Sequence, residues 1–262
     1  MTNKEYREHE GISRSELQRI ARSPLHFKYA KEHPEEKTPA LMFGSAAHKY
    51  ILEIDDFDKE YAVAPMCDRR TKDGKAEYAE FIANLGDKEV VSPDDMTTIK
   101  EMRDAILANP AACKFLYGDS AKYEQSFFWV DQQTGEAVKC RPDCMIEVDS
   151  KKYIVDYKTT DSCQDGHFEA SCRKYGYKLQ AGMYREGVFQ NTLDDYGFAF
   201  VAQEKKAPYA VRVYICSEEF IGEGYDQYRE LLGIYHSCNE TGVWYGYEGI
   251  TGEPTDLIGE GE

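Results

Sequence analysis

Apolar residues recur every three or four positions in several stretches of the chain, which is the spacing of one face of an α-helix. Two of these stretches have recognisable starts. Ser13 and Glu16 have the spacing of a capping box, and Ser92-Pro93 is followed by the acidic pair Asp94-Asp95, as in the first turn of many helices. The pattern predicts helices over residues 13–22, 25–29, 41–48, 92–107, 167–189 and 217–235, with one more around Tyr78–Ile82.

Shorter runs rich in β-branched and aromatic residues predict strands, mostly after residue 120. Thr134-Gly135 marks one turn, and residues 149–152 form a tight polar turn, so the runs that flank the second turn should pair as a hairpin. We expect strands over residues 123–130, 137–148, 152–158, 197–203 and 209–215, and a loop with a short strand over 56–65. Helices and strands of this number indicate an α/β fold.

The hairpin concentrates the polar chemistry. Asp143 lies just before its apolar part, and Asp156 and Lys158 lie on one face of its second strand, with Tyr157 on the other. Ile154-Val155 indicates a buried strand, where a carboxylate needs a specific partner. Two carboxylates and a lysine could hold Mg²⁺ and activate a water for phosphodiester hydrolysis. An ordinary surface ion pair, worth about 0–1 kcal/mol, is the alternative.

Four further residues could join this site, each with an ordinary structural alternative. Glu124, on the preceding predicted strand, could add a third carboxylate or be an exposed strand residue. His48 could supply a neutral imidazole ligand or be a simple helix histidine. Gln180 and Tyr184 share a helix face and could hold a DNA phosphate or Lys158, although spacing alone favours packing of Tyr184 in the core.

The net charge of −16, from 32 basic and 48 acidic residues, excludes a broadly basic nucleic-acid surface. The acid is uneven, because the chain from His236 onward has six carboxylates and no Lys or Arg. Such a tail is expected to be solvated and mobile. Basic residues gather locally between Arg14 and Lys31, where an amphipathic helix face is an equal explanation, and in the loop 68–75.

No apolar run is long enough to span a bilayer or to act as a secretory signal, so we expect a soluble intracellular protein. The eight cysteines include no C-x-x-C pair, which argues against a zinc ribbon or a secreted disulfide framework. Most are expected to be reduced and partly buried.

Four separated motifs, in order, resemble the RecB-type branch of the PD-(D/E)xK nucleases: Gly44-x-x-x-His48, Arg141-Pro142-Asp143, Asp156-x-Lys158 and Gln180-x-x-x-Tyr184. Softer motifs are similar to the RecE (exonuclease VIII) nuclease domain and its phage relatives. These are Ile12-Ser13-x-Ser15-x-Leu17, Ser23-Pro24-Leu25-His26, Phe43-Gly44-x-Ala46-Ala47-His48 and the run from Asp68 to Lys75. The resemblance covers about residues 10–215.

The resemblance implies a restriction-endonuclease-like core, with a central mixed sheet flanked by helices and an N-terminal helical extension. It implies a Mg²⁺-dependent exonuclease, with Mn²⁺ able to substitute, that degrades the 5′-ended strand of linear duplex DNA and leaves 3′ single strands for recombination. Lys158 would assist the nucleophilic water, with Gln180 and Tyr184 also in the catalytic group. The implied metal ligands are His48, Asp143, Asp156, the Tyr157 backbone carbonyl and, less directly, Glu124.

By the same analogy, the protein would form a ring of three or four copies around DNA, in the cytoplasm of a bacterial host of a phage or prophage. A single-strand annealing protein of RecT type would be its partner. Related CRISPR-adaptation and AddB-type nucleases hold an iron–sulfur cluster with cysteines near the C-terminus, but here only Cys216 and Cys238 lie that far along, so no cluster is expected. The expected DNA or 5′-phosphate contacts are Ser15, Arg69, Arg70, Lys72 and Lys75.

These expectations divide the chain into a helical region (1–120) that contributes His48, a nuclease core (121–236) and an acidic tail (237–262). Three alternatives remain open from the sequence. One is another RecB-type nuclease, either an endonuclease or an enzyme of 3′–5′ polarity. The second is a catalytically idle DNA-binding relative, against which the intact Asp143, Asp156 and Lys158 argue. The third is a structural acidic protein, in which the pairing of the Arg-Pro-Asp and Asp-x-Lys motifs would be a coincidence.

Overall fold

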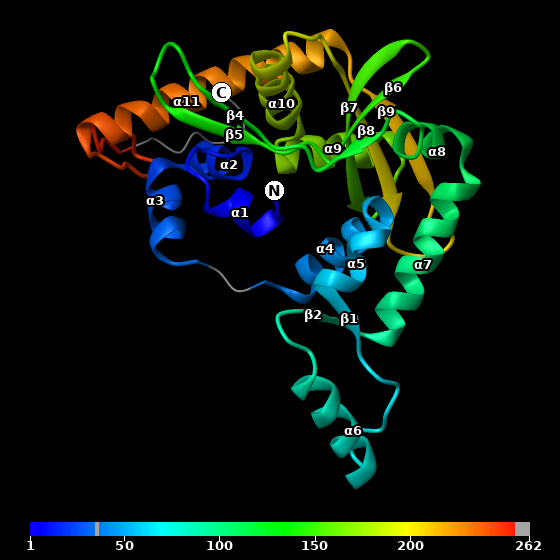
Figure 1. The fold of residues 1–262 in the computed structure, drawn as a ribbon. Coiled ribbons are helices and arrows are strands. Elements are labelled where there is room, and N and C mark those ends of the chain that lie inside the picture. Colours follow the sequence, from blue (N-terminus) through cyan, green and yellow to red (C-terminus); the bar gives the residue numbers. More distant parts are fainter. Residues whose placement is uncertain (35–36, 255–262) are drawn as a thin grey trace, which may run out of the picture.

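The computed structural model describes residues 1–34 and 37–254 (Figure 1). Its helices are α1 (Asn3–Glu8), α2 (Arg14–Arg22), α3 (Pro24–Glu32), α4 (Pro39–Leu52), α5 (Ile54–Glu60), α6 (Lys72–Ala83), α7 (Pro93–Ala108), α8 (Pro110–Leu116), α9 (Asp165–Tyr175), α10 (Tyr177–Thr192) and α11 (Glu218–Thr241). Its strands are β1 (Tyr61–Val63), β2 (Glu89–Val91), β3 (Lys122–Tyr123), β4 (Phe127–Val130), β5 (Ala137–Cys140), β6 (Cys144–Val148), β7 (Lys151–Thr160), β8 (Gly197–Glu204) and β9 (Val211–Ile215).

A five-stranded mixed sheet in the order β3-β6-β7-β8-β9 forms the centre of the fold. Only β7 and β8 are parallel, and α9 and α10 provide the crossover between them. The predicted hairpin is confirmed as β6-β7, with Val148 paired to Lys151 across a two-residue turn. Asp149 and Ser150 both have positive φ (50° and 62°), the backbone geometry that suits a tight hairpin between twisted strands. The predicted α/β class with a central mixed sheet is correct.

Helices cover both faces of this sheet, because the side chains of each strand alternate between two apolar layers. On one face, α4, α5, α7 and α8 pack against residues such as Val155 and Val201. On the other, α9, α10 and the start of α11 pack against residues such as Ile154 and Phe198. The strand β7 is therefore buried on both sides, as its apolar sequence predicted.

A third packing layer joins the N-terminal helices to the rest of the molecule. The helices α2 and α3 pack with α10, α11 and the β4-β5 hairpin, and Ile12 forms a parallel bridge with Val138 of β5. The long helices α10 and α11 touch backbone to backbone at Gly182 and Gly224. A Cβ atom at Gly182 would lie 2.1 Å from the backbone nitrogen of Tyr225, so only glycine allows this approach.

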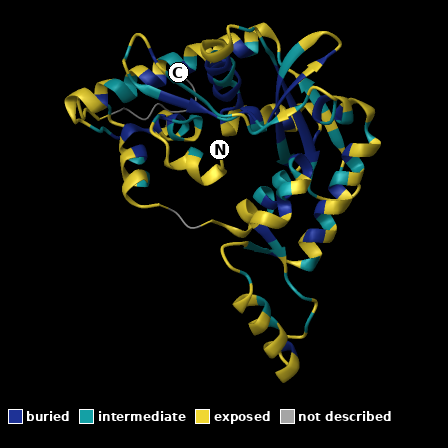
Figure 2. Ribbon diagram, viewed as in Figure 1, coloured by how far each residue is buried: buried dark blue, intermediate teal, exposed yellow. Residues whose placement is uncertain are grey.

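The helix α6 forms an arm that projects from the small β1-β2 sheet (Figure 1). Extended segments lead into and out of the arm, and Gly74 is its one buried residue (Figure 2). The sequence-based prediction placed residues 68–75 in a loop. The structure corrects this, because Thr71 accepts a hydrogen bond from the Gly74 amide (3.0 Å) and caps a helix that already begins at Lys72.

Two predicted strands are interrupted in the structure. The run 123–130 splits into β3 and β4, and the run 137–148 splits into β5 and β6, so that the two halves of each run belong to different sheets. The first break lies at Glu124, which has a positive φ of 51°. The second lies at Arg141-Pro142-Asp143, where proline cannot donate to a strand ladder. Both breaks lie at the predicted site.

Several predicted helix limits also change. The helix predicted over 167–189 is two helices, because Gly176 adopts a left-handed conformation (φ 64°) between α9 and α10. The first part of the loop and short strand expected over 56–65 is helical, because α5 runs from Ile54 to Glu60. The last helix continues to Thr241, and Trp244 then stacks on Phe27 of α3. The predicted tail thus includes helix and packed residues, while 255–262 lie outside the described residues.

All eight cysteines are unpaired, and five of them are buried. Within the described residues, none of the helices is long and apolar enough to cross a membrane.

A buried hydrogen-bond chain anchors β7 beneath the polar face of the hairpin. The Tyr157 hydroxyl donates to Oε1 of Gln203 on β8 (2.6 Å), and Nε2 of Gln203 donates to the Met102 carbonyl oxygen on α7 (2.7 Å). Gln203 is fully buried. Its two ends therefore fix the strand that carries Asp156 and Lys158 to the helix layer behind it.

We predict that Tyr157→Phe lowers the free energy of unfolding by about 1–2 kcal/mol and Gln203→Leu by about 2–4 kcal/mol, because each leaves buried polar groups without partners. The double variant should lose roughly 1 kcal/mol less than the sum of the two, since both changes break the same bond. Urea denaturation of the unaltered protein, the two single variants and the double variant measures this coupling. Additive losses would show that the bond does not contribute.

Candidate active site

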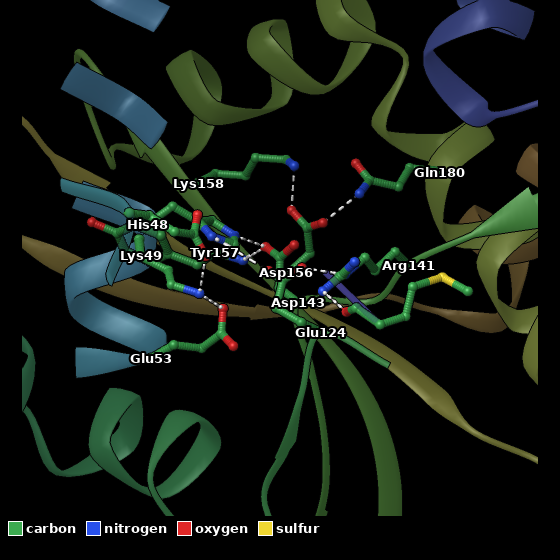
Figure 3. Close-up of polar contacts among 12 residues, drawn as sticks. His48, Lys49, Glu53, Glu124, Arg141, Asp143, Asp156, Tyr157, Lys158 and Gln180 are labelled. Carbon is green, nitrogen blue, oxygen red and sulfur yellow. Dashed lines mark hydrogen bonds and ion pairs between the residues drawn. The ribbon is translucent and has the colours of Figure 1, made fainter. Parts of the chain in front are cut away.

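The site lies at the end of the central sheet where β6 begins beside β7. Asp143 immediately precedes β6, and its Oδ2 accepts a hydrogen bond from the backbone N–H of Tyr157 (2.8 Å). This bond ties the start of one strand to its neighbour and brings the Asp143 and Asp156 side chains together (Figure 3). The hairpin thus brings both predicted acids to one place.

Asp156 and Lys158 lie on the same face of β7, as strand alternation predicted. The Lys158 ammonium pairs with Oδ1 of Asp156, and Nε2 of Gln180 on α10 donates to Oδ2 of the same carboxylate (Figure 3). Asp156 is only 1% exposed. A buried carboxylate needs donors for both oxygens, which explains why Gln180 contacts Asp156.

His48 reaches the same place from the opposite face of the sheet. It lies on α4, with Nε2 2.9 Å from Oδ2 of Asp143 and Nδ1 3.6 Å from Oε1 of Glu124. The helices α4 and α10, which cover different faces, therefore meet at this end of the sheet. The positions of His48, Asp143 and Gln180 in the sequence give no hint that they lie together. The sheet topology brings them to one place.

Glu124 lies in the break between β3 and β4, so it is not on a strand as predicted. Its left-handed backbone (φ 51°) costs about 1 kcal/mol for a residue with a side chain. The break turns the Glu124 amide toward the Asp143 carbonyl oxygen (3.1 Å), and the carboxylate faces His48. Backbone strain of this kind is often found at functional sites.

Arg141 is a residue of the site to which the sequence pattern gave no role. Its Nε lies 2.6 Å from Oε2 of Glu124, and its side chain is 10% exposed. The signal was present, because Arg141 belongs to the same tripeptide as Asp143. What the pattern could not show is that the β5–β6 break turns the arginine toward Glu124.

Crowded buried charges shift the pKa values of the site in different directions. Burial lowers the pKa of His48, but the charge and hydrogen bond of Asp143, with the other carboxylates, outweigh burial and raise it to about 9. Burial raises the pKa of Asp143, yet its contacts with His48, and to a lesser extent Lys158, hold that pKa below its ordinary value. These two groups are therefore an ion pair at neutral pH.

The other two carboxylates resist ionisation. Burial, followed by the charge of Asp143, raises the pKa of Glu124 to about 7, with His48 and Arg141 opposing the rise. The same two causes raise the pKa of Asp156 to about 6, against the opposing charge of Lys158. Three carboxylates thus repel one another in a small space. A bound cation would relieve this repulsion.

A divalent cation fits the side chains that are present. One ligand atom from each of His48, Glu124 and Asp143 lies within 4.8 Å of the others. Carboxylate oxygens suit a hard ion such as Mg²⁺, with metal–oxygen distances of about 2.1 Å, and imidazole suits Mn²⁺ and related ions. Asp156 lies outside this group of three, since Lys158 and Gln180 hold its oxygens.

Two predicted residues have surroundings that differ from those of the acids. Tyr184, one helical turn after Gln180, is partly buried and packs with the apolar layer near Phe198. Tyr184 also lines a cavity that reaches Asp143, Asp156 and Lys158, so its position fits both the packing that its spacing favoured and a place at the site. The side chain of Tyr157 points away from the site toward Gln203, while its backbone N–H donates a hydrogen bond to Asp143.

Two cavities reach the site, and both are lined by His48, Tyr157 and Lys158. The α4-side cavity, of about 820 Å³, continues between α1 and the helices α4 and α5. The α2-side cavity, of about 510 Å³, continues between α1, α2 and α10, and Ser15 lies on its wall. A substrate can therefore approach the acids from two directions.

The remaining predicted DNA contacts lie on the α6 arm. The Arg69 guanidinium stacks over the Tyr78 ring at 4.0 Å, and Arg70 pairs with Asp68 (3.0 Å). Within the described residues, neither cavity at the site is lined by the four basic residues of this group: Arg69, Arg70, Lys72 and Lys75. The structure thus brings Ser15 to the site but leaves these four apart from it.

A family model for a PDDEXK-like domain of unknown function (DUF3799) matches residues 13–251. Among solved structures, a candidate exonuclease from Eubacterium rectale is similar over 99% of this chain and 96% of its own, with a TM-score of 0.67 and 17% identity. At that identity the likeness shows the fold. The structure of SSO0001 covers 88% of this chain and 81% of its own at 14% identity, but its TM-score of 0.38 supports no argument. None of the curated proteins matches.

We predict that divalent metal binding strengthens as pH rises from 6 to 9. Protons on Glu124 (pKa about 7) and His48 (pKa about 9) compete with the metal, and raising the pH removes them. The dissociation constant for Mn²⁺ should fall about tenfold per pH unit for each proton released. Calorimetry in buffers of different ionisation enthalpy measures both the constant and the protons.

In the matched variant His48→Gln, the dissociation constant should no longer change with pH well above 7, where the His48 proton competes. It should still change around pH 7, where the Glu124 proton competes. A dissociation constant that does not change with pH in the unaltered protein would exclude both residues as ligands.

Proposed function

The chain belongs to the family of PDDEXK-like domains, and we propose that it is a metal-dependent deoxyribonuclease. The observation that carries this proposal is the convergence of Asp143, Asp156 and Lys158 with His48 and Glu124 at one end of the sheet. An idle DNA-binding relative has no need for buried acids that repel one another. Such an arrangement is costly to fold, and a cation and a phosphate would relieve the cost.

The residues have separate roles in the proposed hydrolysis. His48, Asp143 and Glu124 would hold the metal. The likeness of the motifs to RecB-type nucleases supports Asp156 and the Tyr157 carbonyl as further ligands. A bound Mg²⁺ would neutralise the scissile phosphate and lower the pKa of a water. Lys158 lies beside the acids at the meeting point of both cavities, where its ammonium can orient the attacking water or contact the phosphate.

Gln180 and Arg141 position the acids in this scheme. Gln180 holds one oxygen of Asp156, which leaves the carboxylate's other oxygen to Lys158. Arg141 balances the charge of Glu124 and fixes its direction. Because both contacts are buried, the acids are oriented before substrate arrives, and this lowers the cost of reaching the transition state.

We propose further that the substrate is the 5′-ended strand of linear duplex DNA and that the product is a 3′ single strand for recombination. The support is the likeness of the motifs to RecE-type nucleases, with Mg²⁺ as metal and Mn²⁺ as substitute. The same likeness supports a phage or prophage origin, a ring of three or four copies, an annealing partner of RecT type, and a cytoplasmic location.

The nuclease proposal predicts Mg²⁺-dependent loss of end-labelled linear duplex DNA, abolished by a chelator. Asp156→Asn and Lys158→Ala should each lower the rate by roughly 10²–10⁴-fold, since each removes a group that acts on the reacting atoms. Asp161→Asn is the matched control, because Asp161 is an exposed acid just beyond the end of the same strand. No degradation with either metal would end the proposal, and full activity of Asp156→Asn would reject the site.

The polarity proposal predicts release of a 5′ label as mononucleotide at the start of digestion, with a 3′ label released last. Phosphorothioate linkages at both 5′ ends should stop the reaction, whereas the same linkages at both 3′ ends should not. The reverse pattern would indicate 3′–5′ polarity. Nicking of a closed duplex circle at the rate of linear DNA would indicate an endonuclease instead.

A further inference from the structure

The short helix α1 is held over the site by hydrogen bonds to its backbone and by its Tyr6 ring, which lies near Phe128 and beneath Lys139 and Arg141. Arg141 donates to the carbonyl oxygens of Met1 (3.3 Å) and Thr2 (3.1 Å) at its start. Lys139 of β5, only 6% exposed, donates to the carbonyl oxygens of Tyr6, Arg7 and His9 at its end. None of the residues of α1 is buried. The helix is thus a strap fastened at both ends, not a packed part of the core.

This strap stands between the two cavities that meet at the acids. Thr2, Asn3 and Glu5 line the α4-side cavity, Tyr6 lines the α2-side cavity, and Arg7 lines both. Figure 1 shows α1 between α2 and the pair α4–α5. A polymer that passes from one cavity to the other must therefore run beneath α1 and past Lys158.

The size of the cavities decides what can pass. Volumes of about 820 and 510 Å³ fall in the range of roughly 300–1,000 Å³ that encloses one small molecule. A few linked nucleotides fit such a space, and a duplex does not. A strand with no free end could not enter beneath a strap that is fastened at both ends.

The charges favour one direction of passage. The α2-side cavity has five Lys or Arg side chains against three carboxylates, and the α4-side cavity has five Lys or Arg side chains and five carboxylates, most of them already in ion pairs. His48 lines both cavities and so does not change the comparison. The cations of the α2-side cavity are Arg7, Arg14, Arg19, Lys139 and Lys158. A phosphate chain would be attracted into the α2-side cavity, and a released nucleotide would leave through the α4-side cavity.

Arg7 is placed to contact a strand on its way. Within residues 1–34 and 37–254, its guanidinium has no hydrogen-bond or ion-pair partner. It lies on the strap and lines both cavities, as Lys158 does from β7. An unpaired cation at a passage suits a passing phosphate.

We propose that α1 restricts the site to single DNA strands that have a free end, which thread beneath it from the α2 side. This inference rests on the proposed nuclease function, because it names the substrate class of the same site. It also gives a physical reason for attack at ends: the strap, and not the acids, excludes closed strands.

The test compares linear and circular single strands of one 60-nucleotide sequence. Binding is measured by fluorescence anisotropy with Asp156→Asn protein in Ca²⁺, where cleavage does not interfere. The linear strand should bind at least tenfold more tightly than the circle. A linear strand blocked by streptavidin at both biotinylated ends should bind like the circle. Equal binding of the three strands would overturn the proposal without any change to the strap.

Two changes to the strap should abolish this preference. Removal of residues 1–9 deletes α1, and Lys139→Met frees its end but keeps the helix. Either should bring the affinity ratio of linear to circular strand close to one. Lys100→Met, an exposed lysine on α7, is the matched control and should keep the ratio. Thermal melting shows whether each variant is folded, and an unchanged ratio in a folded variant would overturn the proposal.

Degradation separates this inference from the proposed function. With Mg²⁺, the unaltered protein should digest the linear strand and leave the circle intact, and the two strap variants should cut the circle. If the linear strand is preferred in binding but is never degraded, the nuclease proposal is wrong and the strap proposal stands. If linear and circular strands are degraded alike, the nuclease proposal stands and the strap proposal is wrong.

Discussion

The mutual repulsion of three carboxylates at one end of a sheet is the constraint on which this structure depends. Asp143 stays ionised because His48 and a backbone amide surround it, and its charge then raises the pKa of both Glu124 and Asp156. Each acid has a cation beside it: His48, Arg141 or Lys158. The cations come from separate elements, so the fold must bring those elements together for the acids to be tolerated at all.

The sheet meets this requirement by covering its two faces with different helices that converge at the same end. From one face α4 supplies His48, and from the other α10 supplies Gln180. The breaks at Glu124 and before Asp143 end two strands where these helices meet. In a regular strand, side chains alternate between the two faces of the sheet, whereas Glu124 and Asp143 lie in the breaks and are not bound by this alternation. The buried Tyr157–Gln203 hydrogen bond holds the uninterrupted strand β7 beside them.

The proposed action on DNA requires an acidic protein to place positive charge where the strand would run. Here the net charge is −16, yet the α2-side cavity is lined by more cations than carboxylates. Lys139 and Arg141 donate hydrogen bonds to backbone carbonyl oxygens of α1 and its N-cap, and both side chains keep their positive charge. Lys139 thus both fastens one end of the strap and lines the α2-side cavity, where its charge would attract a phosphate chain.

The sequence by itself determined the hairpin, its polar turn, and the shared face of Asp156 and Lys158, because strand alternation and turn chemistry are local. It also indicated the α/β class and most helices. It could not show the split strands, since Glu124 and Arg141 reach their positions only through tertiary contacts. The partners of His48 and Gln180 were likewise decided by the sheet order, which joins residues far apart in the sequence: Asp143 comes 95 positions after His48, and Gln180 comes 24 positions after Asp156. The strap α1 was not predicted. Its capping box, Thr2 with Glu5, is a start signal in the sequence, but no apolar face follows it, and hydrogen bonds from Lys139 to its backbone help to hold it in place.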